Sequence, residues 1–279
     1  MATPAESKLK PSEVLITGGR GYIGSHLLTL TDALVLDLSE GTSLRVFDPR
    51  ETRYRDVKIV VHLADRRLEE LTAENLSENL RLHENFLKKT EDLPRLEKVI
   101  FSSSCSVYGF SEEWISESSP VRPTSFYAES KLSVERLLNE SSVPSRILRF
   151  GTAHGWSRRM RSDLLVNQFA RAAARGERLK VFAPHSWRPY IHCRDFARVL
   201  RAEIFSDRKG LKNVVTENLS KQQILDSEPL RRAGFRHDVV EQGDPRDYRV
   251  TVDSSLLRDR VGVSEGIDEM MEHYRANQT

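Results

Sequence analysis

The sequence predicts an α/β fold in which a doubly wound parallel sheet is followed by a smaller C-terminal substrate lobe. Three observations lead to this prediction. Short apolar runs alternate with helical patterns up to about residue 150, a glycine-rich turn joins the first run to the first helix, and beyond that point the alternation loosens while Arg, Gly and Pro become frequent. We therefore expect residues 11–150 to form the main domain, residues 151–279 to form mostly the substrate lobe with segments that return to the main domain, and residues 1–10 to be a disordered lead-in.

The elements follow from the hydrophobic patterning. Apolar runs of strand length occupy residues 14–17, 34–38, 44–47, 57–63, 99–101 and 144–150. Helical patterns between them occupy residues 22–30, 73–89 and 125–139. Strands that alternate with helices pair in parallel, with helices on both faces of the sheet. In the second half, helical patterns stand out at residues 164–175, 194–204 and 264–275.

The composition excludes several classes of protein. The 43 Lys and Arg against 41 Asp and Glu leave a net charge of +2, so bulk charge gives no reason to expect a nucleic-acid partner. No apolar run approaches the ~18–20 residues that cross a bilayer, and the opening residues lack the apolar stretch of a signal peptide. Cys105 and Cys193 are the only cysteines, and no Cys or His residues are paired at metal-binding spacing. We expect a cytoplasmic protein with no bound metal and no membrane partner.

The first apolar run opens into a glycine-rich turn. Gly18, Gly21 and Gly24 are spaced three residues apart between a strand and a helix. The first glycine of such a turn permits a tight bend, the second lets backbone N–H groups approach a pyrophosphate, and the third lets the helix pack close to the strand. The positive end of the helix dipole also favours the anion. Asp37 ends the second run, where a carboxylate accepts hydrogen bonds from ribose hydroxyls and repels a 2′-phosphate, so the pattern predicts NAD on a Rossmann-type domain.

A tyrosine and a lysine lie four residues apart in a later helical pattern. Tyr127 and Lys131 therefore share one helix face, where the ammonium of Lys131 stabilises a phenolate on Tyr127. This makes Tyr127 a candidate proton shuttle. Lys131 would also reach the nicotinamide ribose, and Ser104, at the end of the preceding strand, would reach the same substrate oxygen. Alone, such a pair is more typical of a solvated helix face, and it gains weight from the dinucleotide motif before it.

Several segments carry a resemblance to a known family. They are TGGRGYIGSH at residues 17–26, HLAD at 62–65, FSSSCSVYG at 101–109, SFYAESK at 125–131, LRFGTAHG at 148–155 and WRPYIHCRD at 187–195. Together they resemble the extended short-chain dehydrogenase/reductases, and more narrowly the NAD-dependent nucleotide-sugar epimerase/dehydratase family. The resemblance spans nearly the whole chain. One departure is Asp65, which stands where the family's HLAA has alanine and is expected close to the cofactor.

The resemblance implies a mechanism and a set of site residues. Tyr127 would remove a proton from a sugar hydroxyl as hydride passes to NAD, while Lys131 holds the ribose and Ser104 supports the proton transfer. The implied cofactor-binding residues are Gly18, Gly21, Tyr22, Ile23, Gly24, Asp37, Leu38, Asp48, Pro49, Leu63, Ala64, Asn79, Tyr127, Lys131 and Phe150. The implied substrate residues, which would bind a nucleotide-diphosphate sugar, are Ser104, Thr152, Arg188, Asp244 and Arg246.

The residues beside Ser104 favour one branch of the family. Dehydratases of the family carry an Asp-Glu pair at this place, whereas this chain has Cys105 and Ser106, so elimination lacks an acid and a base. The segment SSSCSVYG instead resembles the 4-epimerases. We therefore expect an NAD-dependent nucleotide-sugar epimerase acting at C4 through a transient keto-sugar. The alternatives are a nucleotide-sugar 4-keto reductase or dehydrogenase and an NAD-binding non-catalytic member. A homodimer is expected through the helices at residues 73–89 and 125–139.

Overall fold

A computed structural model describes residues 9–66, 70–241, 246–253, 255 and 257–276. Of the expected lead-in, residues 1–8 lie outside the described residues. The chain divides into two compact units. Unit 1 comprises Met1–Ser103, Ser125–Leu148 and Ala197–Lys212, and unit 2 comprises Ser104–Thr124, Arg149–Phe196 and Asn213–Thr279. Residues 104–124 thus belong to unit 2 and residues 197–212 to unit 1, and the expected division of the chain into domains stays a prediction.

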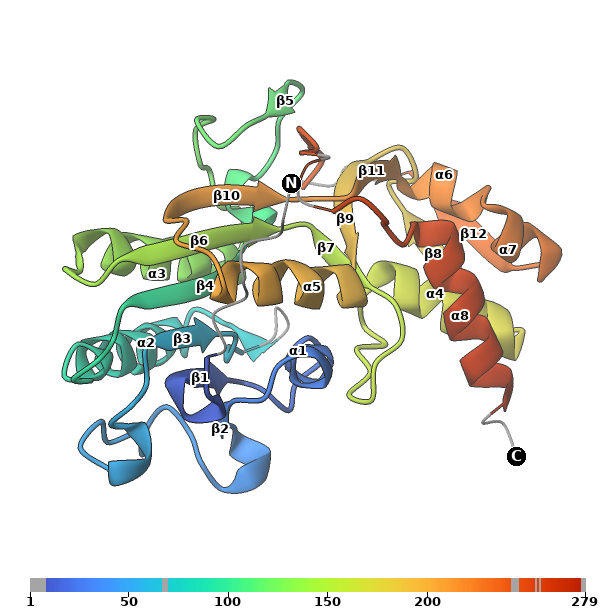
Figure 1. The fold of residues 1–279 in the computed structure, drawn as a ribbon. Helices are drawn as coiled ribbons and strands as arrows, with labels where there is room; N and C mark the ends of the chain where they lie inside the picture. The colour runs from blue at the N-terminus through green and yellow to red at the C-terminus, as the bar shows by residue number, and fades with distance from the viewer. Residues whose placement is uncertain (1–8, 67–69, 242–245, 254, 256, 277–279) are drawn as a thin grey trace. The chain divides into compact units, whose positions relative to one another are not determined.

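Unit 1 is built on a six-stranded sheet with the strand order β10-β6-β4-β3-β1-β2 (Figure 1). Its strands are β1 (Val14–Thr17), β2 (Leu34–Leu36), β3 (Ile59–His62), β4 (Lys98–Ser104), β6 (Ser145–Phe150) and β10 (Gly210–Val214). β1 pairs in parallel with both β2 and β3, and β3 pairs in parallel with β4. The chain moves outward from β1 to β2 and then crosses to β3 on the other side of β1. This confirms the doubly wound α/β fold, and it puts the switch point, where such sheets bind ligands, at the carboxyl ends of β1 and β3.

The apolar run at residues 44–47 forms turns and not a strand. Leu44 and Phe47 are buried in the core of unit 1, whereas Arg45 and Val46 between them are exposed. A strand would bury every second residue, while a turn places residues three apart on the same side. The spacing of the two buried side chains therefore explains why this run packs against the sheet without joining it.

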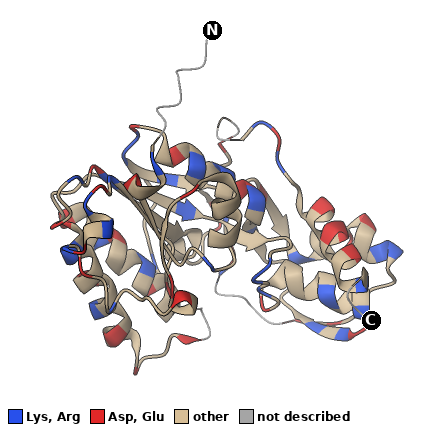
Figure 2. Ribbon diagram, turned by 60° about the horizontal axis from the view of Figure 1, so that its bottom comes forward, with Lys and Arg blue, Asp and Glu red and all other residues tan. Residues whose placement is uncertain are grey.

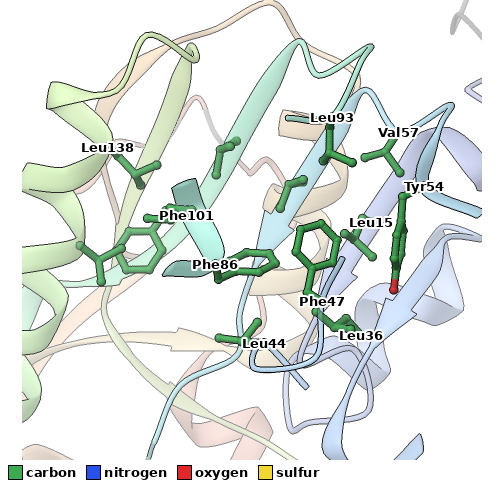
Figure 3. Packing of buried hydrophobic residues seen from close by; sticks show 14 of the residues in the cluster. Leu15, Leu36, Leu44, Phe47, Tyr54, Val57, Phe86, Leu93, Phe101 and Leu138 are labelled. Carbon is green, nitrogen blue, oxygen red and sulfur yellow. The ribbon is translucent and has the colours of Figure 1, made fainter. Parts of the chain in front are cut away.

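An apolar cluster with several aromatic rings fills the core of unit 1 (Figure 3). The ring of Phe47 lies 5.0 Å from that of Tyr54 and 5.1 Å from that of Phe86, measured between centroids. Phe101 of β4 and Leu15 of β1 belong to the same cluster and are buried. Each such side chain contributes roughly 1.5–3 kcal/mol when it leaves water, so the cluster is a main source of stability for the unit that carries the glycine turn.

Helices flank the sheet of unit 1. They are α1 (Gly24–Leu30), α2 (Leu76–Thr90), α3 (Phe126–Glu140) and α5 (Cys193–Ile204), which enters unit 1 at residue 197. The helices predicted at residues 22–30, 73–89, 125–139 and 194–204 are thus confirmed, with ends that differ by up to three residues. α2 packs against α3 (Figure 1). Nε of Arg201 in α5 donates a hydrogen bond to the carbonyl oxygen of Leu30 at the end of α1, at 3.1 Å.

Unit 2 combines small sheets with short helices. The sheets have the orders β11-β9-β7, β12-β8 and β13-β5. Their strands are β5 (Trp114–Ile115), β7 (Thr152–His154), β8 (Arg178–Phe182), β9 (Trp187–His192), β11 (Glu217–Ser220), β12 (Arg236–Val240) and β13 (Arg249–Val250). The helices are α4 (Leu165–Arg175), α6 (Lys221–Leu225), α7 (Glu228–Arg232) and α8 (Val263–Ala276), and α4 packs against α8. The helices predicted at residues 164–175 and 264–275 are confirmed.

Positions with charged residues of both signs are interleaved along the helices (Figure 2). This mixing is consistent with a net charge of only +2. Across the described residues, no helix combines the length and the apolar character that spanning a membrane requires.

Candidate active site

The glycine turn between β1 and α1 has no room for a side chain at Gly18 or Gly24. Gly18 has a φ of +69°, and a Cβ atom on it would lie 2.9 Å from the backbone nitrogen of Ala64. A Cβ atom on Gly24 would meet the carbonyl oxygen of Gly18 and lie 2.6 Å from the Cα atom of Gly19. The N–H of Gly21 donates to the Gly18 carbonyl at 3.0 Å and closes the turn. The turn therefore presents bare backbone at the switch point of the sheet, as the binding of a dinucleotide diphosphate requires.

Asp37 lies directly after β2, and three hydrogen bonds hold its carboxylate. Oδ2 accepts from the backbone N–H of Arg20 at 2.9 Å, while Oδ1 accepts from the backbone N–H and the hydroxyl of Ser39 at 3.0 and 2.8 Å. Arg20 belongs to the glycine turn, so the bond to its backbone ties the carboxylate to that turn. Leu38 beside it is 82% exposed, and its predicted contact with the cofactor stays a prediction.

Four further predicted cofactor residues lie at the same end of the sheet. Tyr22 and Ile23 immediately precede α1, Leu63 and Ala64 immediately follow β3, and all four are half-buried. The N–H groups of Leu63 and Ala64 both donate to the hydroxyl of Thr17, each at 3.2 Å. Unit 1 therefore brings these residues together with the glycine turn.

Asp48 is already engaged by a neighbour. The guanidinium of Arg50 donates to it from Nε and Nη2, each at 2.9 Å, and the backbone N–H of Arg50 donates at 3.1 Å. These hydrogen bonds lower the pKa of Asp48 to about 2. Pro49 between the two residues is buried. An adenine amino group at this place would meet an ion pair, and the predicted contacts of Asp48 and Pro49 with the cofactor stay predictions.

The face of α3 carries Tyr127 and Lys131 together, as their spacing predicts. Lys131 is only 4% exposed, and its Nζ lies 5.5 Å from the centre of the Tyr127 ring. The same Nζ donates to the carbonyl oxygen of Ser102 at 2.8 Å and forms an ion pair with Oδ2 of Asp65 at 3.0 Å. Tyr127 is half-buried, so its phenol is not sealed inside unit 1. The structure therefore brings the predicted catalytic pair together and adds a carboxylate to it.

Asp65 and Lys131 form a charged pair despite their burial. Their side chains are 7% and 4% exposed. Burial opposes the charged form of Asp65, but the charge of Lys131 and the hydrogen bond from His83 outweigh it and hold the pKa of Asp65 below its ordinary value. Burial also opposes the ammonium, but the carboxylate of Asp65 and then Tyr127 raise the pKa of Lys131 above its ordinary value. Lys131 therefore remains an ammonium at neutral pH.

A chain of buried hydrogen bonds leads from Asp65 back to the glycine turn. Nε2 of His83 lies 3.1 Å from Oδ1 of Asp65, and Nδ1 of His83 lies 2.9 Å from Nε2 of His62. Nδ1 of His62 lies 2.8 Å from the hydroxyl of Thr17. Burial, followed by the influence of His83 and Lys131, holds the pKa of His62 well below its ordinary value, so this ring is neutral. Sequence reasoning missed the two histidines, and the one signal that pointed here was the aspartate in place of the family's alanine.

Asn79, predicted to bind the cofactor, belongs to this buried network. It is 1% exposed, and its Nδ2 donates to Oδ1 of Asp65 at 3.2 Å and to the hydroxyl of Ser130 at 3.0 Å. These two bonds use both hydrogens of the amide. Asn79 therefore links α2 to α3 and helps to orient the carboxylate, while its direct contact with the cofactor stays a prediction.

Ser104 ends β4 and begins unit 2. Its Oγ accepts from the backbone N–H of Ser106 at 3.1 Å and so caps a 3₁₀ helix, Cys105–Tyr108. Cys105 is buried, and its Sγ donates to the carbonyl oxygen of Arg149 at 3.2 Å. Neither residue after Ser104 is a carboxylic acid, and the role of Ser104 itself stays a prediction.

Two further predicted residues follow β6. Phe150 is 2% exposed and stacks on Phe196, with ring centroids 3.4 Å apart and an interplanar angle of 13°. Its predicted approach to the nicotinamide stays a prediction, because this ring is already buried in unit 2. Thr152 begins β7, is half-buried and pairs with Tyr190 of β9.

Two of the predicted substrate arginines act on the same tyrosine in unit 2. Burial raises the pKa of Tyr248, while the charges of Arg188 and Arg246 act in the opposite direction. The N–H of Tyr248 donates to the carbonyl oxygen of Trp187, the residue before Arg188, at 3.1 Å. The predicted contacts of Arg188 and Arg246 with a diphosphate stay predictions. Asp244, the remaining predicted substrate residue, lies outside the described residues.

In the part of the chain that the structure describes, no group of three or more His, Cys, Asp or Glu side chains is arranged to hold a metal ion. The bare glycine turn and the fixed carboxylate of Asp37 instead suit a dinucleotide with free ribose hydroxyls, such as NAD.

Comparison of the sequence with known proteins gives consistent matches. A family model described as the NAD dependent epimerase/dehydratase family matches residues 14–213. A UDP-glucose 4-epimerase of Azospirillum brasilense is 32% identical over 171 residues, which cover 51% of this chain and 45% of the relative. A UDP-glucose 4-epimerase of Halalkalibacterium halodurans is 29% identical over 150 residues, 45% of each chain. The chain therefore spans about half the length of these curated relatives. A dTDP-glucose 4,6-dehydratase of Streptomyces niveus is 23% identical over 317 residues, which cover 95% of this chain and 93% of the relative.

Solved structures share the fold over nearly the whole chain. A UDP-glucose 4-epimerase of Thermus thermophilus in complex with NAD has a TM-score of 0.75 and 25% identity, and the match covers 95% of this chain and 99% of that one. The NAD-dependent NDP-hexosamine 5,6-dehydratase TunA has a TM-score of 0.82 and 22% identity, and the match covers 95% and 98%. At 22% identity, the second likeness concerns the fold alone.

Proposed function

The chain belongs to the NAD dependent epimerase/dehydratase family, and from this premise we propose that it is an NAD-dependent nucleotide-sugar 4-epimerase. Its substrate would be a nucleotide-diphosphate sugar whose C4 hydroxyl is oxidised to a transient keto group and then restored on the other face. NAD bound at the glycine turn supplies an acceptor and a donor of hydride for these two half-reactions. The residues of this chain supply the proton transfer and hold the two ligands.

One observation carries the proposal. Lys131, buried and charged, lies 5.5 Å from the ring of Tyr127, within the unit that carries the glycine turn. A cation at this distance stabilises a phenolate, so Tyr127 takes the proton of the sugar hydroxyl at Oη and later returns it. Epimerisation suits this arrangement because both half-reactions need one group that accepts a proton and gives it back. Ser104 would donate or accept a hydrogen bond at the same hydroxyl.

The cofactor side of the proposal depends on Asp37 and the glycine turn. The turn offers backbone N–H groups to the diphosphate, and a helix N-terminus adds favourable dipole charge. A fixed carboxylate next to it accepts hydrogen bonds from ribose hydroxyls and repels a 2′-phosphate. We therefore expect NAD and not NADP.

The substrate side depends on Arg188 and Arg246. A guanidinium donates two parallel hydrogen bonds to a phosphate, and two such groups match the charge of a diphosphate. We assign the diphosphate of the sugar nucleotide to these two side chains in unit 2.

A 4,6-dehydratase is the second candidate. The dTDP-glucose 4,6-dehydratase relative aligns with 95% of this chain, whereas the 4-epimerase of Azospirillum brasilense aligns with 51%. Elimination of a C6 hydroxyl needs an acid and a base besides Tyr127, however, and Cys105 and Ser106 supply neither. The chemistry of these two residues favours epimerisation.

The deciding experiment incubates the purified chain, without added cofactor, with UDP-, dTDP- and GDP-sugars and follows the anomeric protons by NMR. Interconversion of two C4 epimers would support the proposal. A 4-keto-6-deoxy product would replace it with a dehydratase, and turnover only with added NADH would indicate a reductase. No turnover in the presence of bound NAD would indicate a non-catalytic member. The control is Tyr127→Phe, which should keep NAD and lose turnover by at least about 10²-fold.

A further inference from the structure

The hydrogen-bond chain between the glycine turn and Lys131 has only one consistent direction. The hydroxyl oxygen of Thr17 accepts from the backbone N–H of Ala64 and shares the N–H of Leu63 with the Thr17 carbonyl oxygen, so we assign the hydrogen of the hydroxyl to Nδ1 of His62. Nε2 of His62 then carries the hydrogen that Nδ1 of His83 accepts, and Nε2 of His83 carries the hydrogen that Asp65 accepts. A carboxylate only accepts, so the other end of the chain requires the same direction.

The rings of His62 and His83 in this row of hydrogen bonds are held in place. The ring of His62 stacks on Phe86 and Phe101, with centroids 5.0 and 5.8 Å away and interplanar angles of 28° and 29°. His83 is 1% exposed. Stacking on two aromatic rings fixes the ring plane of His62, and the directed hydrogen bonds fix which nitrogen carries the proton. The orientation set at the backbone is therefore transmitted to Asp65.

The two carboxylate oxygens of Asp65 have different partners. Oδ1 accepts from Nε2 of His83 at 3.1 Å, from Nδ2 of Asn79 at 3.2 Å and from the backbone N–H of Arg66 at 2.8 Å. Oδ2 faces Nζ of Lys131 at 3.0 Å. One oxygen is thus anchored to the protein scaffold, and the other is directed at the ammonium.

The charge at Lys131 depends on a small set of groups. The ammonium donates a hydrogen bond to the Ser102 carbonyl oxygen and forms an ion pair with Oδ2 of Asp65. The titratable groups that act on it from β3, from the loop after β3 and from α3 are His62, Asp65, Tyr127 and Glu135, and His83 of α2 acts through Asp65. Asp65 has the shortest of these contacts, so it does most to determine where the ammonium lies and how firmly it keeps its proton.

The row of hydrogen bonds from Thr17 to Asp65 does not carry protons out to solvent. Thr17, His62 and His83 are each at most 1% exposed, and the chain ends at two backbone N–H groups, which do not release protons to solvent. What it provides is a fixed orientation.

We propose that Asp65 is a positioning residue that acts through Lys131. Oriented from the glycine turn by the histidine chain, its carboxylate holds the ammonium beside Tyr127 and balances part of its charge. The inference rests on the proposed function, in which that ammonium stabilises the Tyr127 phenolate. The family pattern that this chain resembles has alanine here, so a variant with alanine at this position measures what the carboxylate adds.

The first test compares pH–rate profiles of Asp65→Asn and Asp65→Ala with that of the unaltered chain. Without the opposing charge, the buried ammonium gives up its proton more readily, so the alkaline limb should move to lower pH by about 1–3 units. Asp92→Asn, an exposed carboxylate in the same unit, is the matched control and should leave the profile unchanged. A fall in turnover with an unmoved alkaline limb would make Asp65 merely structural and would overturn the proposal.

The second test does not depend on activity. Nitrogen NMR of the cofactor-free chain should show the Nε2–H tautomer at both His62 and His83, with the His83 hydrogen protected from exchange. Asp65→Ala should remove that protection. Asp65→Asn retains an oxygen acceptor and the side-chain volume, so it should keep the protection. An Nδ1–H tautomer at His83, or protection unchanged in Asp65→Ala, would overturn the positioning role. If no sugar is turned over at all, the proposed function fails, and this second test still decides whether Asp65 is oriented as described.

Discussion

At Gly18 two constraints on the side chain coincide. Its φ of +69° is a left-handed conformation, and a Cβ atom would also meet the backbone of Ala64. Gly41 has nearly the same φ, +70°, but a Cβ atom there would find no atom within 4 Å. Substitutions at Gly41 therefore measure the effect of backbone strain alone, whereas substitutions at Gly18 add the steric effect of a side chain at the cofactor site.

We expect Gly18→Ala to lose NAD binding and Gly41→Ala to retain it. The strain of a left-handed residue costs both variants about 1–2 kcal/mol of stability, but only the first pushes a methyl group between β1 and the residues after β3. Calorimetric titration with NAD, together with thermal unfolding, separates the two effects. Equal NAD affinity in the two variants would contradict the assignment of the glycine turn.

Asp65 should make stability depend on pH in a predictable window. Its folded-state pKa lies below the unfolded value of about 3.9, so its stabilising contribution is present above that pH and is lost as the pH falls toward the folded value. Asp65→Asn should destabilise the chain by about 3–5 kcal/mol at neutral pH, because it leaves a buried ammonium without its partner. The difference should shrink below about pH 4. Urea unfolding of the unaltered protein and of Asp65→Asn between roughly pH 3 and pH 7 measures this difference in stability. A difference that does not change with pH would rule out the charged pair.

At the scale of elements, α5 is fastened to the sheet by a buried ion pair. Arg146 of β6 donates to Glu203 of α5 from Nε at 3.1 Å and from Nη2 at 3.2 Å. Lys98 of β4 donates to the carbonyl oxygen of the same glutamate at 2.7 Å. Glu203 is fully buried, so three elements of unit 1 depend on one residue.

Glu203→Gln should therefore lower the free energy of unfolding by about 3–5 kcal/mol, since it leaves a buried guanidinium uncompensated. The matched control is Arg208→Ala. Arg208 also approaches Glu203, at 3.5 Å, but its side chain is 52% exposed, and its loss should change stability by about 1 kcal/mol or less. Denaturant unfolding measures both changes. An unchanged dependence of the unfolding free energy on denaturant concentration would show that the substitution alters stability alone. Similar losses in the two variants would contradict the importance given to burial.

The predicted elements differ from the observed ones for a physical reason. Helices α2 and α3 could be predicted because their buried residues recur at helical spacing over four turns. The run at residues 44–47 is equally apolar but too short to show a period, and its two buried side chains are held by contacts with distant elements. The strands of unit 2 are short, and β8 and β12 contain several charged residues, so hydrophobic patterning gave no clear signal for them.

At the scale of the whole molecule, we predict a homodimer formed through α2 and α3. These helices pack against each other, and α2 carries a row of exposed residues at Ser77, Glu78, Arg81, Asn85 and Lys88. Sedimentation equilibrium at micromolar concentration should give twice the 32.0 kDa of one chain. Arg81→Glu in that row should shift the equilibrium toward monomer, whereas Lys209→Glu, an exposed residue outside both helices, should not. A single-chain mass for the unaltered protein would refute the prediction.

The sequence by itself determined the features whose parts are close together in the chain. The glycine turn is set within seven residues, Tyr127 and Lys131 are set by one helical turn, and Cys105 and Ser106 adjoin Ser104. Only the tertiary structure decided what surrounds them. His62 and His83 are 21 residues apart and Arg146 and Glu203 are 57 apart, and neither pair has a spacing that signals contact. The physical reason is that a buried charge or ring nitrogen is satisfied by whichever group the packed sheet and helices bring to it, and packing is a property of the whole chain.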